Sequence, residues 1–317
     1  MSAQKPSEYL ISSGDEPRVY QAFTTDDLMG YHGGLMARQL KNADEPRFML
    51  YAPIWDGDSA PFGFTGRPAS HGLAVTADRF VITRNFHTEG VPHSAQIIPF
   101  GQVLCVHVGT VHLMGWFAVR HADGGRVVTT TIFHKATGTD LFIEAIRAYR
   151  TATRPAALRG LAAPASGLTW EHLWGKTPRW SLIRQFTPLL LDGEQPLGLI
   201  RSGQARASGR RGWRKSSHSL AGESVLVETT ERLLQAVREP EVQPGVRSYG
   251  LNFTSICRQA VRSASLLDAA VKGVPLSLRL TLATGTGEMT LDVPFDESCR
   301  PQAQQIVGRL VGSDRHD

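Results

Sequence analysis

Apolar and β-branched residues recur along most of this chain in short runs typical of β-strands, and few segments show helical periodicity. One series of strand-like runs occupies residues 47–55, 72–83, 97–108, 113–120 and 127–133. A second series occupies residues 196–202, 224–236, 247–262, 275–284 and 288–295. Helical patterns occur at residues 26–40, 140–150, 169–186 and 300–311. The pattern predicts a mainly β (α+β) protein in which each series of strands closes with a helix.

The two series share a sequence motif. GLAVTADRFVIT at residues 72–83 returns as SVLVETTERLLQA at residues 224–236, and in each copy an apolar strand leads to Thr, any residue, an acid and Arg. A further apolar segment begins 24 residues after the motif Thr, at Phe100 and at Phe253. An internal repeat fixes the size of the folding unit, so we expect two halves of like topology. This alignment places Cys105 and Cys257 in matching strands and an insertion at residues 263–274.

About six or seven strands ending in an amphipathic helix, with V-x-T-x-D/E-R on the second strand, resemble the bacterial pleckstrin-homology-like (PH-like) families. The resemblance covers residues 47–150 and 195–311. It implies two tandem, strongly bent sheets or partly open barrels, each closed by its C-terminal helix. Members of these families bind lipid headgroups, peptides or one another and share no catalytic residues, so the resemblance alone implies no activity.

The repeat and the composition together predict the domain boundaries. A loose N-terminal segment (1–24) precedes a first domain with an upstream helix (25–150), and an Ala/Pro-rich linker (151–167) leads to a second domain with upstream helical material (168–312) and a short tail (313–317). No signal peptide and no apolar run of about 20 residues is present. The three cysteines form no CxxC pair. These features predict a cytoplasmic protein, with a peripheral position at the inner face of the membrane as the alternative.

The motif arginines, Arg79 and Arg232, each follow an acid, Asp78 or Glu231. A ligand contact is one interpretation. The favoured interpretation is structural, because the same acid–Arg pair ends the strand in both copies whatever else differs between them.

Positive charge is concentrated in the middle of the chain. The formal net charge is +5, whereas residues 145–219 contain thirteen Lys and Arg and three Asp and Glu, a local net charge of +10. The remainder of the chain is therefore acidic. Such an uneven distribution indicates a local binding surface for anions rather than a uniformly basic protein.

The densest basic segment is the predicted loop at residues 203–222, which contains no acid. The corresponding loop of the first half carries Asp56 and Asp58 and only Arg67. In eukaryotic PH domains the loop after the first strand binds phosphorylated headgroups, so the resemblance implies a role for this position. Clustered cations are attracted to acidic membranes by about 1 kcal/mol each, and Trp favours the membrane interface. The candidate anion-binding residues are Arg201, Arg206, Arg210, Arg211, Trp213, Arg214 and Lys215. A solvated basic loop without a dedicated ligand is the alternative.

Other chemistries are favoured less. One short basic cluster with one aromatic residue is weak evidence for nucleic-acid binding. The phosphate-loop ending Gly175-Lys176-Thr177 has Trp170 where the first glycine is required. Histidines gather in the first half without the cysteine or carboxylate partners that a metal site needs: His87, His93, His107, His112, His121 and His134. We therefore predict no catalytic residues, no cofactor and no metal.

The sequence thus predicts a non-enzymatic adaptor that is recruited to acidic lipid headgroups, or to an acidic protein partner, through the basic segment of its second half. A protein–protein scaffold without lipid affinity is the first alternative. A metal-dependent enzyme that uses the histidines of the first half is the second.

Overall fold

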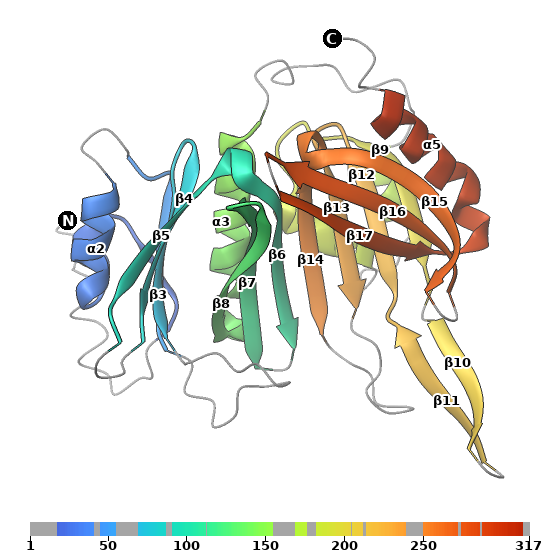
Figure 1. Cartoon of the computed structure of the whole chain (residues 1–317), viewed down its shortest axis with the longest axis horizontal. Coiled ribbons are helices and arrows are strands. Elements are labelled where there is room, and N and C mark those ends of the chain that lie inside the picture. The colour runs from blue at the N-terminus through green and yellow to red at the C-terminus, as the bar shows by residue number, and fades with distance from the viewer. Residues whose placement is uncertain are drawn as a thin grey trace. The chain divides into compact units, whose positions relative to one another are not determined.

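The computed structural model describes residues 18–40, 45–54, 69–86, 91–111, 113–154, 169–175, 182–203, 205–211, 214–238, 250–271, 274–285 and 287–312. These residues form a mainly β structure of several antiparallel sheets, as the sequence predicts (Figure 1). The predicted linker lies mostly outside the described residues, and so do the predicted tail and most of the predicted N-terminal segment. No helix in the described part of the chain is long and apolar enough to cross a membrane.

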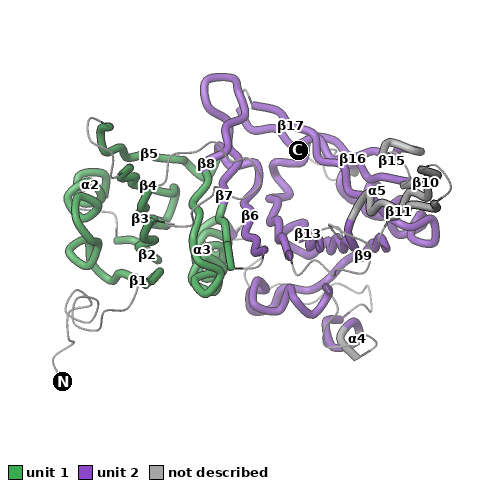
Figure 2. The backbone as a smooth tube through the Cα atoms, turned by 90° about the horizontal axis from the view of Figure 1, so that it is seen from below, with its two compact units in different colours: residues 1–101, 113–117, 131–153 green, residues 102–112, 118–130, 154–317 purple. Residues whose placement is uncertain are grey.

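The chain divides into two compact units, coloured separately in Figure 2. Unit 1 comprises residues 1–101, 113–117 and 131–153, and unit 2 comprises residues 102–112, 118–130 and 154–317. The unit boundary therefore passes through two strands of the first half of the sequence, and also through the Ala/Pro-rich segment between residues 153 and 154.

Unit 1 is built on a five-stranded antiparallel sheet in sequential order. Its strands are β1 (Tyr20–Ala22), β2 (Phe48–Ala52), β3 (Ser70–Val75), β4 (Arg79–Asn85) and β5 (Ser94–Pro99). Helix α2 (Tyr31–Gln39) packs on one face, where Met36 and Ala74 share a buried cluster. On the other face, Phe80 contacts Tyr149 of α3 (Thr139–Ala152), with ring centroids 5.1 Å apart. Successive residues of β3 and β4 therefore face different helices, which explains why both strands are buried on both sides.

The helix predicted at residues 26–40 divides into two pieces. A 3-10 turn, η1 (Thr25–Asp27), comes first, and α2 begins after Gly30, whose φ is +61°. That left-handed conformation favours glycine and interrupts the helix. Inside α2, the buried ring of His32 bonds to Thr83 Oγ1 through Nδ1 at 2.8 Å and to Ser70 Oγ through Nε2 at 2.9 Å. These bonds fix the helix on the sheet.

Unit 2 contains a hydrophobic core between two sheets. A seven-stranded sheet runs in the order β8-β7-β6-β14-β13-β12-β9, and a three-stranded sheet runs in the order β15-β16-β17. The bounds are β6 (Val103–Val111), β7 (Met114–Asp123), β8 (Arg126–Lys135), β9 (Pro196–Ser202), β12 (Ser224–Thr229), β13 (Arg232–Arg238), β14 (Leu251–Cys257), β15 (Val261–Val271), β16 (Val274–Thr284) and β17 (Gly287–Phe295). Residues 114–117 of β7 and 131–135 of β8 belong to unit 1.

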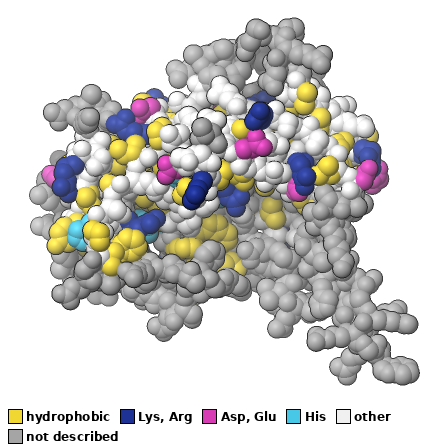
Figure 3. Space-filling model, viewed as in Figure 1, with side chains coloured by type: hydrophobic (Ala, Val, Ile, Leu, Met, Phe, Trp, Pro, Cys, Tyr) yellow, Lys and Arg dark blue, Asp and Glu magenta, His cyan; other side chains and the backbone are white. Residues whose placement is uncertain are grey.

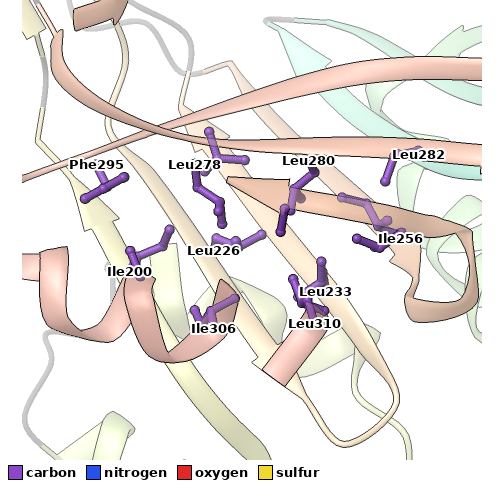
Figure 4. Close-up of a cluster of buried hydrophobic side chains, with 14 of the residues drawn as sticks. Ile200, Leu226, Leu233, Ile256, Leu278, Leu280, Leu282, Phe295, Ile306 and Leu310 are labelled. Atoms are coloured by element: carbon purple, nitrogen blue, oxygen red, sulfur yellow. The ribbon is translucent and has the colours of Figure 1, made fainter. Parts of the chain in front are cut away.

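The core of unit 2 lies between its two sheets and helix α5 (Arg300–Gly312). Figure 4 shows Leu226 and Ile256 from the seven-stranded sheet meeting Leu278 from the three-stranded sheet and Ile306 from α5. Helix α5 approaches β9 closely at Gly198, where an added Cβ would lie 3.0 Å from Ile306 Cγ1. The predicted closing helix at residues 300–311 therefore seals this core.

The order of elements is the same in the two halves of the sequence. Four strands (β2–β5, or β9 and β12–β14) lead through a 3-10 turn to three strands (β6–β8 or β15–β17), then through another 3-10 turn to a helix (α3 or α5). The turns after the fourth strands are η3 (Phe100–Gln102) and η7 (Arg258–Ala260). The predicted insertion at residues 263–274 falls within β15 and the start of β16, where it lengthens a hairpin.

The predicted match of Phe100 with Phe253 was wrong. Arg79 pairs with Pro99, and the other motif arginine, Arg232, pairs with Cys257, so Pro99 corresponds to Cys257. Phe253 lies inside β14, because the connection between β13 and β14 is longer than the one between β4 and β5. Cys105 and Cys257 are therefore not in matching strands. They belong to β6 and β14, which pair directly with each other.

Gly115 of β7 leaves room for an aromatic stack in unit 1. A Cβ at Gly115 would lie 2.2 Å from Cε1 of His134, whose ring stacks on Phe142 with centroids 4.2 Å apart. We expect Gly115→Ala to lower the free energy of unfolding by about 2 kcal/mol, because the confined ring must shift. Urea unfolding would measure the loss. Gly101→Ala is the matched control, since a Cβ there meets nothing within 4 Å, and equal stability of both variants would contradict the prediction.

Candidate functional site

The basic segment of the second half forms a hairpin, so the prediction of a loop at residues 203–222 was wrong. Strands β10 (Ala205–Arg211) and β11 (Arg214–Ala221) make a two-stranded antiparallel sheet of their own. These strands could not be recognised from the sequence, because Arg, Ser, Gly and Lys dominate them and no apolar alternation is present. Trp213 lies outside the described residues.

The register of the hairpin brings the basic positions together in pairs. Arg210 is opposite Lys215, and Arg211 is opposite Arg214. Directly opposed residues share a face of a sheet, and neighbouring pairs alternate between faces. The end of the hairpin therefore has two neighbouring cationic cross-strand pairs, and Arg206 lies four residues before Arg210 on the same strand. Like charges opposite one another destabilise a sheet unless an anion compensates them.

The root of the hairpin is fixed to the core of unit 2. Gly203 donates its N–H to the carboxylate of Asp296, at 3.3 Å to Oδ1 and 3.2 Å to Oδ2. The N–H of Asp296 in turn donates to the carbonyl oxygen of Arg201 at 2.9 Å. Arg201, the first candidate residue, is exposed on β9. The hairpin thus starts from an anchored point beside the segment that leads into α5.

On one face of the described surface, opposite charges lie close together. On the face shown in Figure 3, Lys and Arg side chains lie beside Asp and Glu side chains. Arg279, for example, donates to both carboxylate oxygens of Asp292 at 2.8 Å, which lowers the pKa of that carboxyl. The charges of Arg279 and Asp292 therefore compensate each other.

The repeated Thr-x-acid-Arg motif is a turn between strands, as the structural interpretation predicted. Thr76 Oγ1 accepts the N–H groups of Asp78 at 3.3 Å and Arg79 at 3.1 Å, and Arg79 pairs with the Asp78 carboxylate at 3.1 Å. In the second copy, Thr229 Oγ1 accepts the N–H groups of residues 231 and 232 at 3.2 and 2.9 Å. The threonine satisfies the backbone donors that the turn exposes.

The motif acid of the second copy, Glu231, pairs with an arginine outside the motif, whereas Asp78 of the first copy pairs with the neighbouring Arg79. Glu231 pairs with Arg154 at 2.8 Å, and Arg232 is buried. The predicted pairing of the motif arginine with its neighbouring acid therefore holds for Arg79, whereas the Glu231 carboxylate is used to hold another part of unit 2.

The histidines are placed as packing and hydrogen-bonding residues. His93 stacks on Tyr31 at 3.9 Å, His134 Nδ1 bonds to the carbonyl of Lys135 at 2.8 Å, and His121 Nε2 bonds to Thr130 at 3.3 Å. His87 and His112 lie outside the described residues. Within the described ranges, no group of three His, Cys, Asp or Glu side chains converges as a metal site.

Cys105 and His107 form a buried pair that the sequence did not predict. Cys105 Sγ lies 3.2 Å from Nε2 of His107, whose Nδ1 bonds to Thr254 Oγ1 at 2.8 Å. Burial raises the pKa of Cys105 to about 12 and lowers the pKa of His107 to about 3. Both groups are therefore neutral at pH 7, so the thiolate that nucleophilic chemistry requires is not formed. The bond between His107 and Thr254 joins β6 to β14.

The aromatic segment before β9 serves packing. It comprises α4 (Trp170–Gly175) and a 3-10 helix, η6 (Leu182–Leu189). Trp170 Nε1 donates to the carbonyl of Glu194 at 2.8 Å, and the buried Glu194 carboxylate accepts from Thr229 Oγ1 at 2.6 Å. Phe186 is fully buried and contacts Phe253. These contacts hold the segment against the strands of unit 2.

Glu228 is a buried charged residue that the pattern of the sequence did not reveal. It is fully buried on β12 and accepts from Arg258 Nη1 at 3.0 Å and from Arg309 Nε and Nη2 at 2.8 and 2.6 Å. The two arginines belong to η7 and α5. One carboxylate therefore ties the closing helix and the turn after β14 to the sheet.

Comparison with known proteins adds no family assignment. No protein-family model matches the chain, and no curated protein matches it significantly.

Proposed function

We propose that this chain is a non-enzymatic binding protein that uses the β10–β11 hairpin as a cationic arm against an acidic lipid surface. The observation that carries the proposal is the register of the hairpin, in which Arg210 opposes Lys215 and Arg211 opposes Arg214. Two opposed cationic pairs at the end of an anchored hairpin suit a surface of many anions better than a single small ligand. Arginine adds the bidentate geometry that phosphate groups accept.

The shared order of elements supports the wider proposal that the two halves are PH-like repeats produced by duplication. Each half has four strands, three further strands and a closing helix. The hairpin lies between the first and second of these strands in the second half, β9 and β12, which is the position where the resemblance implies headgroup binding. A peripheral location at the inner face of the membrane follows from this proposal.

Charge reversal of the hairpin tests the proposal. The quadruple variant Arg210→Glu, Arg211→Glu, Arg214→Glu and Lys215→Glu should lose binding to liposomes that contain acidic lipids. Removal of four cations at about 1 kcal/mol each corresponds to about a thousandfold weaker binding. Co-sedimentation at low and high salt measures it, and wild-type binding should weaken as salt screens the charges.

The matched control reverses four cations outside the hairpin, Arg18, Arg38, Arg126 and Arg147, with the same change in formal charge. This control should retain most of the binding. An equal loss in both variants would assign the attraction to net charge rather than to the hairpin. Unaltered binding by the hairpin variant would refute the proposed site, and a wild-type chain that binds no acidic liposome would favour the protein–protein scaffold.

A further inference from the structure

Unit 2 contains a joint between strands from the two halves of the sequence. Strand β6 of the first half pairs antiparallel with β14 of the second, over the register from Thr110↔Leu251 to Cys105↔Ile256. At its centre His107 and Thr254 are directly opposed and hydrogen-bonded at 2.8 Å. Val106 opposes Ser255, and both side chains are buried. The side chains of the central pairs of this joint are therefore buried from water.

The common order of elements identifies the equivalents of these two strands. Strand β14 follows β13 as β5 follows β4, and β15 follows η7 as β6 follows η3. The counterpart of the β6 edge is therefore on β15, and the counterpart of the β14 edge is on β5. Both are terminal strands of their sheets, because in the described part of the chain β5 pairs with β4 and β15 pairs with β16.

We propose that β15 of one copy of this chain pairs with β5 of a second copy, repeating the β6–β14 joint between molecules. Transfer of the β6–β14 register to these strands defines three central cross-strand pairs. They are Ile97↔Ala264, Gln96↔Ser265 and Ala95↔Leu266. Two apolar residues oppose each other in the first and third of these pairs, and two polar residues do so in the second.

Exposure at the β5 edge supports this pairing. Ile97 is 44% exposed, whereas its counterpart Ser255, which β6 covers, is 2% exposed. Covering an isoleucine in this way removes apolar surface from water. In a single copy of the chain, Ile97 is therefore exposed at the position that corresponds to the buried Ser255 of the β6–β14 joint.

The chemistry of both edges also favours pairing. Edge strands that remain single usually carry charges or proline in the strand to prevent association. Residues 94–98 of β5 and 263–267 of β15 contain neither, although Pro99, Arg262 and Asp268 flank them. Because two different edges meet, the contact is heterologous, and repeated addition extends a chain of molecules unless the rotation closes a ring.

Complementary edge variants test the proposal on the full-length protein. Ile97→Lys places a charge on the β5 edge, and the double variant Ser265→Lys, Leu267→Lys places charges on the β15 edge. Sedimentation velocity should show that the wild-type mass rises with concentration past that of a dimer. Each variant alone should stay monomeric, because all of its copies lack one of the two edges that every contact requires. Leu113→Lys, at a residue that is 79% exposed, is the control and should assemble like the wild type.

The mixture of the two variants separates this proposal from other modes of association. Each variant keeps one intact edge, so an equimolar mixture should form a dimer of one copy of each and grow no further. The restored dimer also shows that both variants are folded. A wild type that is monomeric up to its solubility limit, edge variants that assemble like the wild type, or a mixture that yields no dimer would each overturn the proposal.

Discussion

Glu228→Ala is expected to lower the free energy of unfolding of unit 2 by about 3 kcal/mol, at the lower end of the range for breaking a buried ion pair. The carboxylate is fully buried and holds Arg258 and Arg309. Without it, both guanidinium groups lose their partner at the surface of the core. They are 24% and 36% exposed, so water can hydrate them in part, which keeps the loss near the lower end. Urea unfolding followed by far-UV circular dichroism would measure it.

An exposed pair of the same chemistry is the matched control. Arg262 and Glu288 lie 3.0 Å apart, as Arg258 and Glu228 do, but their side chains are 70% and 53% exposed. Glu288→Ala should change the stability by less than about 1 kcal/mol, because water screens a surface ion pair. Similar losses for Glu228→Ala and Glu288→Ala would show that burial does not determine the contribution of these pairs.

The sequence was sufficient for the elements whose apolar pattern is strong. Strand β3 and helix α5 are where their periodicity predicts them, because each buries a regular set of side chains. The pairing of β6 with β14 was not predictable in the same way. It joins residues such as His107 and Thr254, which are 147 positions apart, and local periodicity holds no information on which strands become neighbours.

The sequence predicted which residues form the candidate site but not that most of them lie on a β-hairpin. The basic residues between Arg201 and Lys215 stand out in the sequence, but their strands lack the alternation that indicates a half-buried sheet. Buried polar residues were missed for a different reason. Glu228 and His71 lie near the ends of otherwise apolar strands, each beside another polar residue, and polar residues at strand ends are ordinarily exposed rather than buried.

Acidification between pH 6.5 and 4 is expected to destabilise the fold through three buried histidines. Burial lowers the pKa of His71 to about 3, of His107 to about 3 and of His134 to about 4, from an ordinary value of 6.5. Arg84 beside His71 and Arg120 near His107 lower these pKa values further. Above pH 6.5 the folded and unfolded chains both hold neutral rings, so these groups add no pH dependence there.

Below pH 6.5 the unfolded chain binds protons that the folded chain excludes, so stability falls as the pH falls until the folded pKa values are reached. Each histidine contributes about 1.4 kcal/mol per pH unit in this window. His71 and His134 belong to unit 1 and His107 to unit 2, so acidification should destabilise both units. The pKa of His121 is also lowered by burial and acts in the same direction.

Urea unfolding at a series of pH values, repeated for His107→Gln, tests this account. The amide of Gln retains hydrogen-bonding capacity for Thr254 and does not titrate, so the variant should show a slope of stability against pH that is smaller by about one proton in unit 2 and unchanged in unit 1. Carboxylates such as Asp292, whose pKa is lowered from 3.8 by Arg279, act only at lower pH. Stability that stays constant from pH 7 to 5 and collapses only below 4 would assign acid unfolding to the carboxylates instead.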